Sequence, residues 1–285
     1  MRMKILLKLL LNTELRNNSP SEKTISGLTM IELLIGMIMT AIITIPLLSF
    51  VVNILDTDVT EEAKTNSEQE IQAAVSYIEK DVSQAIYIYD SNDSNFANFA
   101  NHLTSNSQSP KLVFWKREFV EDSICSTGNC NDGEDDSYAL ALVAYYEIPE
   151  TDSDSIWCQP TQKTGCPKRI TRLQIKDGVK DIDGNYVVGA KGQKDVGFRE
   201  FDSSDYLAWT PDGTIAKTPE VLINYIENFT VDSVTDNKLA QITVEGNAMR
   251  RLPGKFDTDK VDCNDVPPYC PKITAQVGKQ SGLGE

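Results

Sequence analysis

The hydrophobic pattern of the chain begins with one long apolar run. Between residues 30 and 55 the only charged residue is Glu32. At a helical rise of about 1.5 Å per residue, this run reaches roughly 39 Å, which exceeds the ~30 Å hydrocarbon layer of a membrane. It therefore predicts a membrane-spanning helix, in which Gly36 and Pro46 loosen the backbone. The presence of Glu32 requires an explanation, because inserting a carboxylate into a membrane at the centre of such a helix costs about 2.5–3.5 kcal/mol, and less near an interface.

An amphipathic pattern follows the apolar run. Apolar residues recur at spacings of three and four over the next thirty or so residues, namely at Val59, Ala63, Ile71, Ala74, Val75, Ile78, Val82, Ala85 and Ile86. Charged residues lie largely off this stripe. The pattern predicts that the helix continues to about residue 89 and that its stripe covers one face of a sheet.

Beyond residue 90 the pattern becomes that of strands. Runs rich in β-branched, aromatic or alternating residues lie at 111–119, 138–148, 169–175, 224–234 and 238–249. The last two flank the sequence "TDN", which predicts a hairpin. Strands that follow one long helix predict an α+β fold with an antiparallel sheet.

The charge distribution divides the chain at the apolar run. The net charge is −15, whereas residues 1–27 contain five basic and two acidic residues, which leaves −18 for the remainder. Because Lys and Arg resist translocation, this asymmetry predicts a cytoplasmic N-terminus and an exported body. Nucleic acid is not expected as a partner, because phosphate binding needs clustered basic residues.

The six cysteines all follow the apolar run and form three close pairs. These are Cys125 and Cys130, Cys158 and Cys166, and Cys263 and Cys270. An even number of cysteines in an exported body predicts disulfides, and the short separations favour pairing within each pair over the other connectivities. Zinc is disfavoured because the spacings do not fit a zinc knuckle and His102 is the only histidine.

An acidic cluster is the one candidate metal site. The sequence "CNDGEDDS" at 130–137 contains Asp132, Glu134, Asp135 and Asp136. Calcium prefers such oxygen ligands, but the spacing is not that of an EF-hand loop. A solvated acidic loop is therefore the preferred interpretation, with calcium as the alternative, and no other cofactor is expected.

Motifs for catalysis are missing from the sequence. There is no Gly-rich phosphate loop, HExxH or GxSxG, and His102 has no recognisable partner motif for a triad. The chain is therefore not expected to be an enzyme. Trp115, Trp157 and Trp209 suit a sugar-stacking surface, but packing in the core or against a disulfide is the favoured interpretation.

The apolar run and its flanks resemble the processing and assembly signal of type IV pilins and type II secretion pseudopilins. The resemblance rests on Gly27 followed by "LTMIELLIGMIMTAIITIPLLS". It implies that prepilin peptidase cuts after Gly27, that Leu28 becomes the N-methylated first residue, and that Glu32 compensates the amine of a neighbouring subunit. Pro46 lies where pilin helices often carry a proline. The sequence departs from the family's pattern in having Leu28 where Phe is commoner and in its long leader.

A second segment resembles one particular subgroup of this family. "AAVSYIEKDVSQAIYIYD" at 73–90 resembles the junction of stalk and head in PilW-like minor pilins and J-type pseudopilins. The long leader, paired cysteines and acidic head are most similar to pseudopilins of cyanobacterial hormogonium polysaccharide secretion. The resemblance implies a pilin-like fold with a leader at 1–27, a transmembrane and assembly helix at 28–55, a stalk helix at 56–90 and a β-rich head at 91–285.

The implied function is that of a minor pilin or pseudopilin in a filament for motility or secretion. Its partners are then prepilin peptidase, other major and minor pilins, and an inner-membrane assembly platform. The chain is expected to cross the plasma membrane once before it enters a periplasmic or extracellular filament. The alternatives are a J-type pseudopilin of type II protein secretion and, in another class, a membrane-tethered ligand-binding head.

Overall fold

The structure is a computed structural model of the whole chain. It describes residues 29–93, 96–105, 107–124, 135–158, 165–181, 183–187, 191–201, 206–252, 263–264 and 267–279. The chain forms two compact units, Met1–Asp56 and Thr57–Glu285. One helix, α2 (Met30–Ser83), contributes to both of them.

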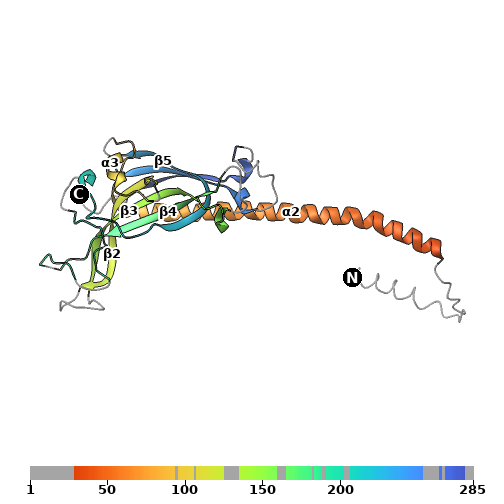
Figure 1. Cartoon of the computed structure of the whole chain (residues 1–285), viewed down its shortest axis with the longest axis horizontal. Coiled ribbons are helices and arrows are strands. Elements are labelled where there is room, and N and C mark those ends of the chain that lie inside the picture. Colours follow the sequence, from red (N-terminus) through yellow and green to blue (C-terminus); the bar gives the residue numbers. More distant parts are fainter. Residues whose placement is uncertain are drawn as a thin grey trace, which may run out of the picture. The chain divides into compact units, whose positions relative to one another are not determined.

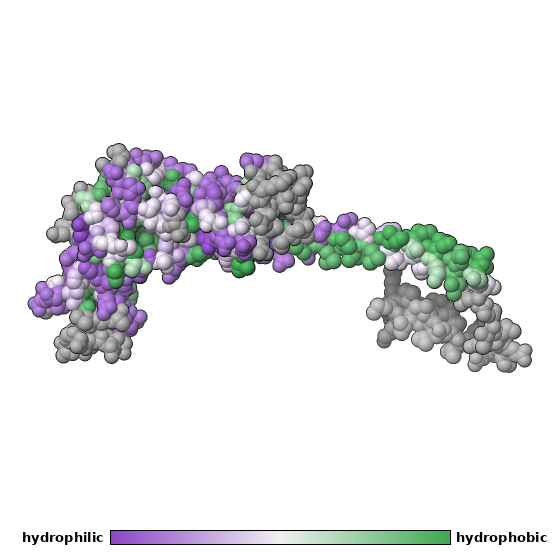
Figure 2. Space-filling view, in the orientation of Figure 1, coloured by the Kyte–Doolittle hydropathy of each residue, from purple (hydrophilic) through white to green (hydrophobic). Residues whose placement is uncertain are grey.

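The first unit contains the apolar part of α2. Its described side chains are all exposed, and on the face seen in Figure 2 they form a mainly hydrophobic surface. The helix continues through Pro46, although proline cannot donate the usual backbone hydrogen bond to Ile42. Six residues before Pro46, the Thr40 hydroxyl donates to the carbonyls of Gly36 and Met37, both at 2.9 Å. The predicted long helix is therefore confirmed, whereas local loosening at Pro46 stays a prediction.

The second unit is built on a single antiparallel sheet. Among the described residues, seven strands follow one another in chain order across it, with bounds β1 (Ala85–Ile88), β2 (Leu112–Ile124), β3 (Asp135–Pro149), β4 (Lys168–Lys176), β5 (Glu220–Thr235), β6 (Leu239–Gly246) and β7 (Lys272–Gly278). Short helical elements join them, namely α3 (Phe96–Asn101), η1 (Ile156–Cys158), η2 (Tyr206–Ala208), η3 (Ala248–Arg251) and η4 (Pro267–Tyr269). Helix and antiparallel sheet together confirm the α+β class.

The predicted stripe of α2 packs on one face of this sheet. Ile71, Ile78 and Val82 are fully buried there and form one core with strand residues such as Phe229 and Val244. Figure 1 shows the sheet curving around this part of the helix. At Gly246 an added Cβ would lie 2.5 Å from Ile71 Cδ1, so glycine permits the close approach of β6 to the helix. The amphipathic pattern therefore predicted the helix face correctly.

The hairpin at "TDN" is confirmed, and it also curves the sheet. Asp236 and Asn237 have φ of 51° and 54°, and Lys238 N–H donates to Thr235 O at 3.0 Å. These positive φ angles suit the tight turn of a hairpin, in which Asp236, Asn237 and Lys238 lie between the paired residues Thr235 and Leu239. The same turn reaches β1, because Ile88 N–H donates to Asn237 O and Asn237 Nδ2 donates to Ile88 O. The sheet is consequently almost closed on itself (Figure 1).

The predicted end of the helix was wrong. Instead of continuing to about residue 89, α2 ends at Ser83, and Ala85–Ile88 forms β1, which pairs with β2. The residues Ile86, Tyr87 and Ile88 favour a strand, and pairing with β2 lets Ile88 be buried completely. The predicted stalk at 56–90 is therefore a helix followed by an edge strand. Helix α3 and strand β7 were not predicted.

A second core covers the opposite face of β2, β3 and β4. Its residues alternate with those of the first, so that Phe114 faces α2 while Val113 and Trp115 face away. Helix α3 and the segment that carries Phe198 and Trp209 close over it. The middle strands are thus buried on both faces, which explains why the run at 138–148 is almost continuously apolar.

Candidate functional site

The first candidate site is the N-terminal end of α2, around Glu32. The N–H groups of Glu32 and Leu33 donate to Thr29 O at 3.0 and 3.2 Å, so the helix begins directly at this point. The Thr29 hydroxyl lies 3.5 Å from Glu32 Oε2. The predicted processing residues Gly27 and Leu28 lie outside the described residues. Glu32 is therefore the acid of the first helical turn, where the helix dipole favours negative charge by about 0.3–1 kcal/mol.

Glu32 stands on an exposed apolar surface, and its position in the first helical turn does not by itself explain a charge there. In the part of the chain that the structure describes, α2 is the one helix long and apolar enough to cross a membrane. None of its most apolar 18-residue window is buried within the chain. Such a surface has to be covered by lipid or by other apolar helices. A carboxylate on it is stabilised best by a cation that the covering molecule supplies.

A second site, at the C-terminal end of α2, was missed by sequence reasoning. The Asp81 side chain is 6% exposed and accepts from three strands at once. Lys116 Nζ on β2 lies 2.9 Å from Oδ1, and the Tyr145 hydroxyl on β3 lies 2.8 Å from Oδ2. Arg172 on β4 adds bonds from Nε at 2.7 Å and from Nη2 at 3.2 Å. We call Asp81, Lys116, Tyr145 and Arg172 the Asp81 cluster.

The electrostatics of the Asp81 cluster favour the ionised carboxylate. Burial alone would raise the pKa of Asp81, but the hydrogen bonds and positive charges of Arg172 and Lys116 outweigh it and lower the pKa. Burial and the neighbouring Asp81 charge both raise the pKa of Tyr145, which therefore stays a hydrogen-bond donor. Burial disfavours the charge on Arg172, but Asp81 more than compensates and raises its pKa. The cluster is a buried, satisfied ion pair network.

This network fixes how α2 sits against the sheet. Its donors come from consecutive strands, so a shift or rotation of the last helical turn would break several charge-assisted hydrogen bonds together. A sequence signal for it did exist. Asp81 stands beside Val82 and three residues after Ile78, on the apolar stripe, and it is the aspartate of the "EKDVSQA" segment. A charge on a core-facing stripe calls for buried partners.

Two of the three predicted disulfides are present. Cys158 is joined to Cys166 in the connection between β3 and β4, and Cys263 is joined to Cys270 ahead of β7. Both close short loops, as local pairing predicted. Cys125 and Cys130 lie outside the described residues, so their pairing stays a prediction.

The acidic cluster is only partly described. Asp132 and Glu134 lie outside the described residues, and Asp135 begins β3 opposite Ile124. Asp136 Oδ1 accepts from the N–H of Asp122 at 2.9 Å, so this carboxylate supports the backbone of β2 where its register with β3 is interrupted. Within the described ranges, no three His, Cys, Asp or Glu side chains are arranged to hold a metal ion. Because Asp132 and Glu134 are not described, the preferred interpretation, a solvated acidic loop, and its alternative, a calcium site, both stay untested.

The tryptophans do not share one surface. Trp115 and Trp209 are 0% and 3% exposed and meet edge to face at 5.5 Å in the second core, as the core interpretation predicted. Trp115 Nε1 donates to the Tyr89 hydroxyl at 2.8 Å. Trp157 is instead 38% exposed and contacts Tyr225 at 5.9 Å between ring centroids. The hypothesis that the three tryptophans form one sugar-stacking surface is therefore wrong.

Comparison of the chain with known proteins found no relative. No protein-family model, curated protein or solved structure matches the chain.

Proposed function

We propose that the chain is a pilin-like subunit of a type IV pilus-like or secretion filament. In this proposal, prepilin peptidase removes residues 1–27 at the cytoplasmic face of the plasma membrane. The apolar part of α2 then holds the subunit in the membrane until an inner-membrane platform assembles it with major and minor pilins or pseudopilins. The sheet-bearing unit is exported, in agreement with the two disulfides among its described residues and with its acidic charge.

The observation that carries the proposal is Glu32. It is the single charge among residues 30–55, and it stands on a surface that no other described residue covers. Cleavage after Gly27 would create an amine on Leu28, four residues before Glu32. When the apolar helices of neighbouring subunits pack together, attraction between that amine and this carboxylate is strong because water is excluded. A pairing between subunits then sets an axial step near one helical turn, roughly 6 Å of rise.

The Asp81 cluster supports a more specific assignment. A filament subunit transmits force between its helix and its exported unit, so the last turn of α2 has to be anchored firmly. Asp81 anchors it to β2, β3 and β4 and belongs to the segment that resembles PilW-like minor pilins and J-type pseudopilins. We therefore favour a minor subunit. A filament for motility, for protein secretion or for polysaccharide export could each contain such a subunit.

The minor role also follows from size. Residues 91–285 make a large exported part for a subunit that repeats along a shaft, where side-by-side packing limits the girth. Few copies, at or near a filament end, accommodate it more easily.

Sheared filaments test this role. Quantitative mass spectrometry of the sheared fraction should detect the chain at well below the amount of the principal pilin, because the proposed subunit occurs in few copies. Shearing a strain that lacks the assembly ATPase controls for membrane fragments. Near-equal amounts would contradict a minor role, and equal recovery from the control strain would contradict filament membership.

A further inference from the structure

A projecting ribbon carries an exposed aromatic pair. The pairing of β2 with β1 ends at Lys116, and that of β3 with β4 begins at Ala141, so the strand ends beyond them form a two-stranded ribbon (Figure 1). On it, Phe119 and Tyr138 are cross-strand partners with ring centroids 5.4 Å apart in an edge-to-face arrangement. These two residues are 53% and 64% exposed. Because aromatic residues are enriched at protein–protein interfaces, such an exposed pair indicates a contact surface.

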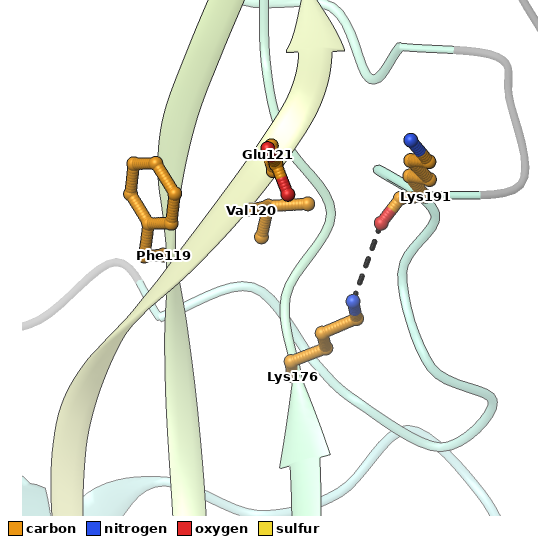
Figure 3. A pocket seen from close by; sticks show the side chains of 5 residues that line it. All are labelled: Phe119, Val120, Glu121, Lys176 and Lys191. Atoms are coloured by element: carbon orange, nitrogen blue, oxygen red, sulfur yellow. Dashed lines mark hydrogen bonds between the residues drawn. The ribbon is translucent and has the colours of Figure 1, made fainter. Parts of the chain in front are cut away.

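The two faces of this ribbon differ. Side chains alternate along a strand, so Val120 points to the face opposite that of Phe119, where it packs with Val179 in a small third core. In Figure 3 the Phe119 ring lies on one side of β2, and Lys176 and Lys191 lie on the other. The ribbon is therefore supported from one face, and the aromatic pair is exposed on the other.

The charges on the aromatic face are arranged along β2. Arg117 and Glu121 lie two residues before and two residues after Phe119, on the same face of the strand, and both are exposed. At about 3.4 Å per residue, each lies about 7 Å from Phe119 along the strand. Neither side chain has a hydrogen bond or ion pair with another residue that the structure describes. The face therefore has a basic end, an aromatic centre and an acidic end.

Such a face is complementary to a second copy of itself. If one ribbon is turned by 180° about an axis across its strands and laid on the other, Phe119 lies over Phe119 and each Arg117 lies opposite the other copy's Glu121. This is the isologous contact of a two-fold dimer, in which every contact occurs twice. A turn about an axis along the strands would instead bring the two acidic ends together, which like charges disfavour.

The acidic end of the face is held in place before a partner arrives. Asp136 Oδ1 accepts from the Asp122 N–H at 2.9 Å, and Lys191 Nζ pairs with the Asp122 carboxylate at 3.1 Å. Lys176 Nζ donates in turn to Lys191 O at 3.2 Å, as Figure 3 shows. These contacts fix the backbone next to Glu121 to β3 and to the end of β4. A preorganised surface has less entropy to lose on binding.

We propose that the aromatic face of the ribbon binds the same face of a second copy of the chain with two-fold symmetry. The rings of Phe119 and Tyr138 from both copies form the apolar centre, and two Arg117–Glu121 ion pairs border it. The contact area is small, so binding is weak between free subunits and becomes significant where copies are concentrated. This inference concerns the sheet-bearing unit alone and does not depend on processing or filament assembly.

Sedimentation equilibrium of the full chain in density-matched micelles tests the proposal. We expect a monomer–dimer equilibrium at concentrations up to about 0.5 mM, because a small interface binds weakly. Phe119→Ala should raise the dimer dissociation constant at least about tenfold, because it removes the centre of the contact. Arg117→Glu alone and Glu121→Arg alone should each raise it about tenfold, because each turns two attractions into two repulsions.

Mixing the two charge variants distinguishes this contact from any other. In a mixed dimer of Arg117→Glu with Glu121→Arg, opposite charges face each other again at both positions. The mixture should therefore dimerise within about threefold of the wild type, and so should the double variant. Lys272→Glu and Trp157→Ala are the matched controls, because they change an exposed cation and an exposed aromatic residue elsewhere, and they should have no effect. Melting curves check that each variant is folded.

Three results would overturn the proposal. One is a wild type that stays monomeric throughout the concentration range. Another is association that survives Phe119→Ala, as association through the apolar helix in the micelle would. The third is a mixture of the two charge variants that dimerises no better than either variant alone.

Discussion

Asp81→Ala should lower the free energy of unfolding of the sheet-bearing unit by about 3–5 kcal/mol, the usual cost of removing one partner from a buried ion pair. The substitution leaves Lys116 and Arg172 with side chains 7% and 15% exposed and without their common acceptor. The Tyr145 hydroxyl loses its acceptor as well. Because a domain of this size is stabilised by only about 5–15 kcal/mol, the loss should be plain in a single denaturation curve.

Urea unfolding of the full chain in micelles, followed by tryptophan fluorescence, measures this loss. Trp115 and Trp209 are suitable reporters because both are buried in the core on the opposite face of the sheet. Glu79→Ala is the matched control, since Glu79 is an exposed acid on the same helix, two residues away. It should change the free energy of unfolding by less than about 0.5 kcal/mol. If Asp81→Ala costs no more than Glu79→Ala, the Asp81 cluster does not anchor the helix.

Acidification gives the same experiment a second readout. The folded pKa of Asp81 is below its ordinary value of 3.8, so its contribution to stability is complete above that value and is lost as the pH falls toward the folded pKa. Asp81→Asn has no such charge. The stability gap between the wild type and Asp81→Asn should therefore be widest near neutral pH and shrink below about pH 4. A gap that stays constant down to pH 2 would show that the charge is not what stabilises the cluster.

Glu32→Ala should reduce incorporation of the subunit into filaments by at least tenfold while leaving its amount in the membrane unchanged. Insertion does not depend on Glu32, because removing a charge from an apolar helix makes membrane transfer easier. Assembly does depend on it in our proposal, because the carboxylate pairs with the amine of a neighbouring subunit. Immunoblots of sheared filaments and of membranes from the same cells measure both quantities. Full incorporation of Glu32→Ala would instead favour a membrane-tethered head that merely uses a pilin-like anchor.

Two further variants separate charge from helix capping. Thr29 and Glu32 have the spacing of a capping box, in which Gln can replace Glu. Glu32→Gln keeps an oxygen that can accept from the Thr29 hydroxyl but removes the charge, and it should fail as Glu32→Ala does. Thr29→Ala removes that hydroxyl but keeps the charge, and it should assemble normally. The opposite pattern would assign Glu32 a purely local role at the start of α2.

The sequence predicted those parts of the fold whose pattern is local. The amphipathic spacing of Ile71, Ile78 and Val82 correctly identified the buried face of α2, because helical periodicity depends only on neighbouring turns. The turn at Asp236 and Asn237 was predictable for the same reason. The end of α2 was not, because "AIYIY" satisfies the helical stripe as well as a strand. Pairing with β2 decides between them, and that contact is distant in sequence.

The candidate sites show the same limit. Glu32 was identifiable because its neighbours in sequence are all apolar, so the charge stands out without a structure. The roles of Lys116 and Arg172 were not identifiable, because a basic residue in a strand gives no signal of its own. Only the fold brings Asp81 between these two side chains.

Our central claim is that the first turn of α2 becomes a new chain terminus beside a lone carboxylate. Intact-mass and N-terminal peptide analysis of the subunit, purified from cells that contain prepilin peptidase, tests this most directly. We predict a chain that begins at Leu28 with a methylated amine, and an unprocessed chain when the peptidase is deleted. A mature subunit that retains Gly27 and the residues before it would contradict the account.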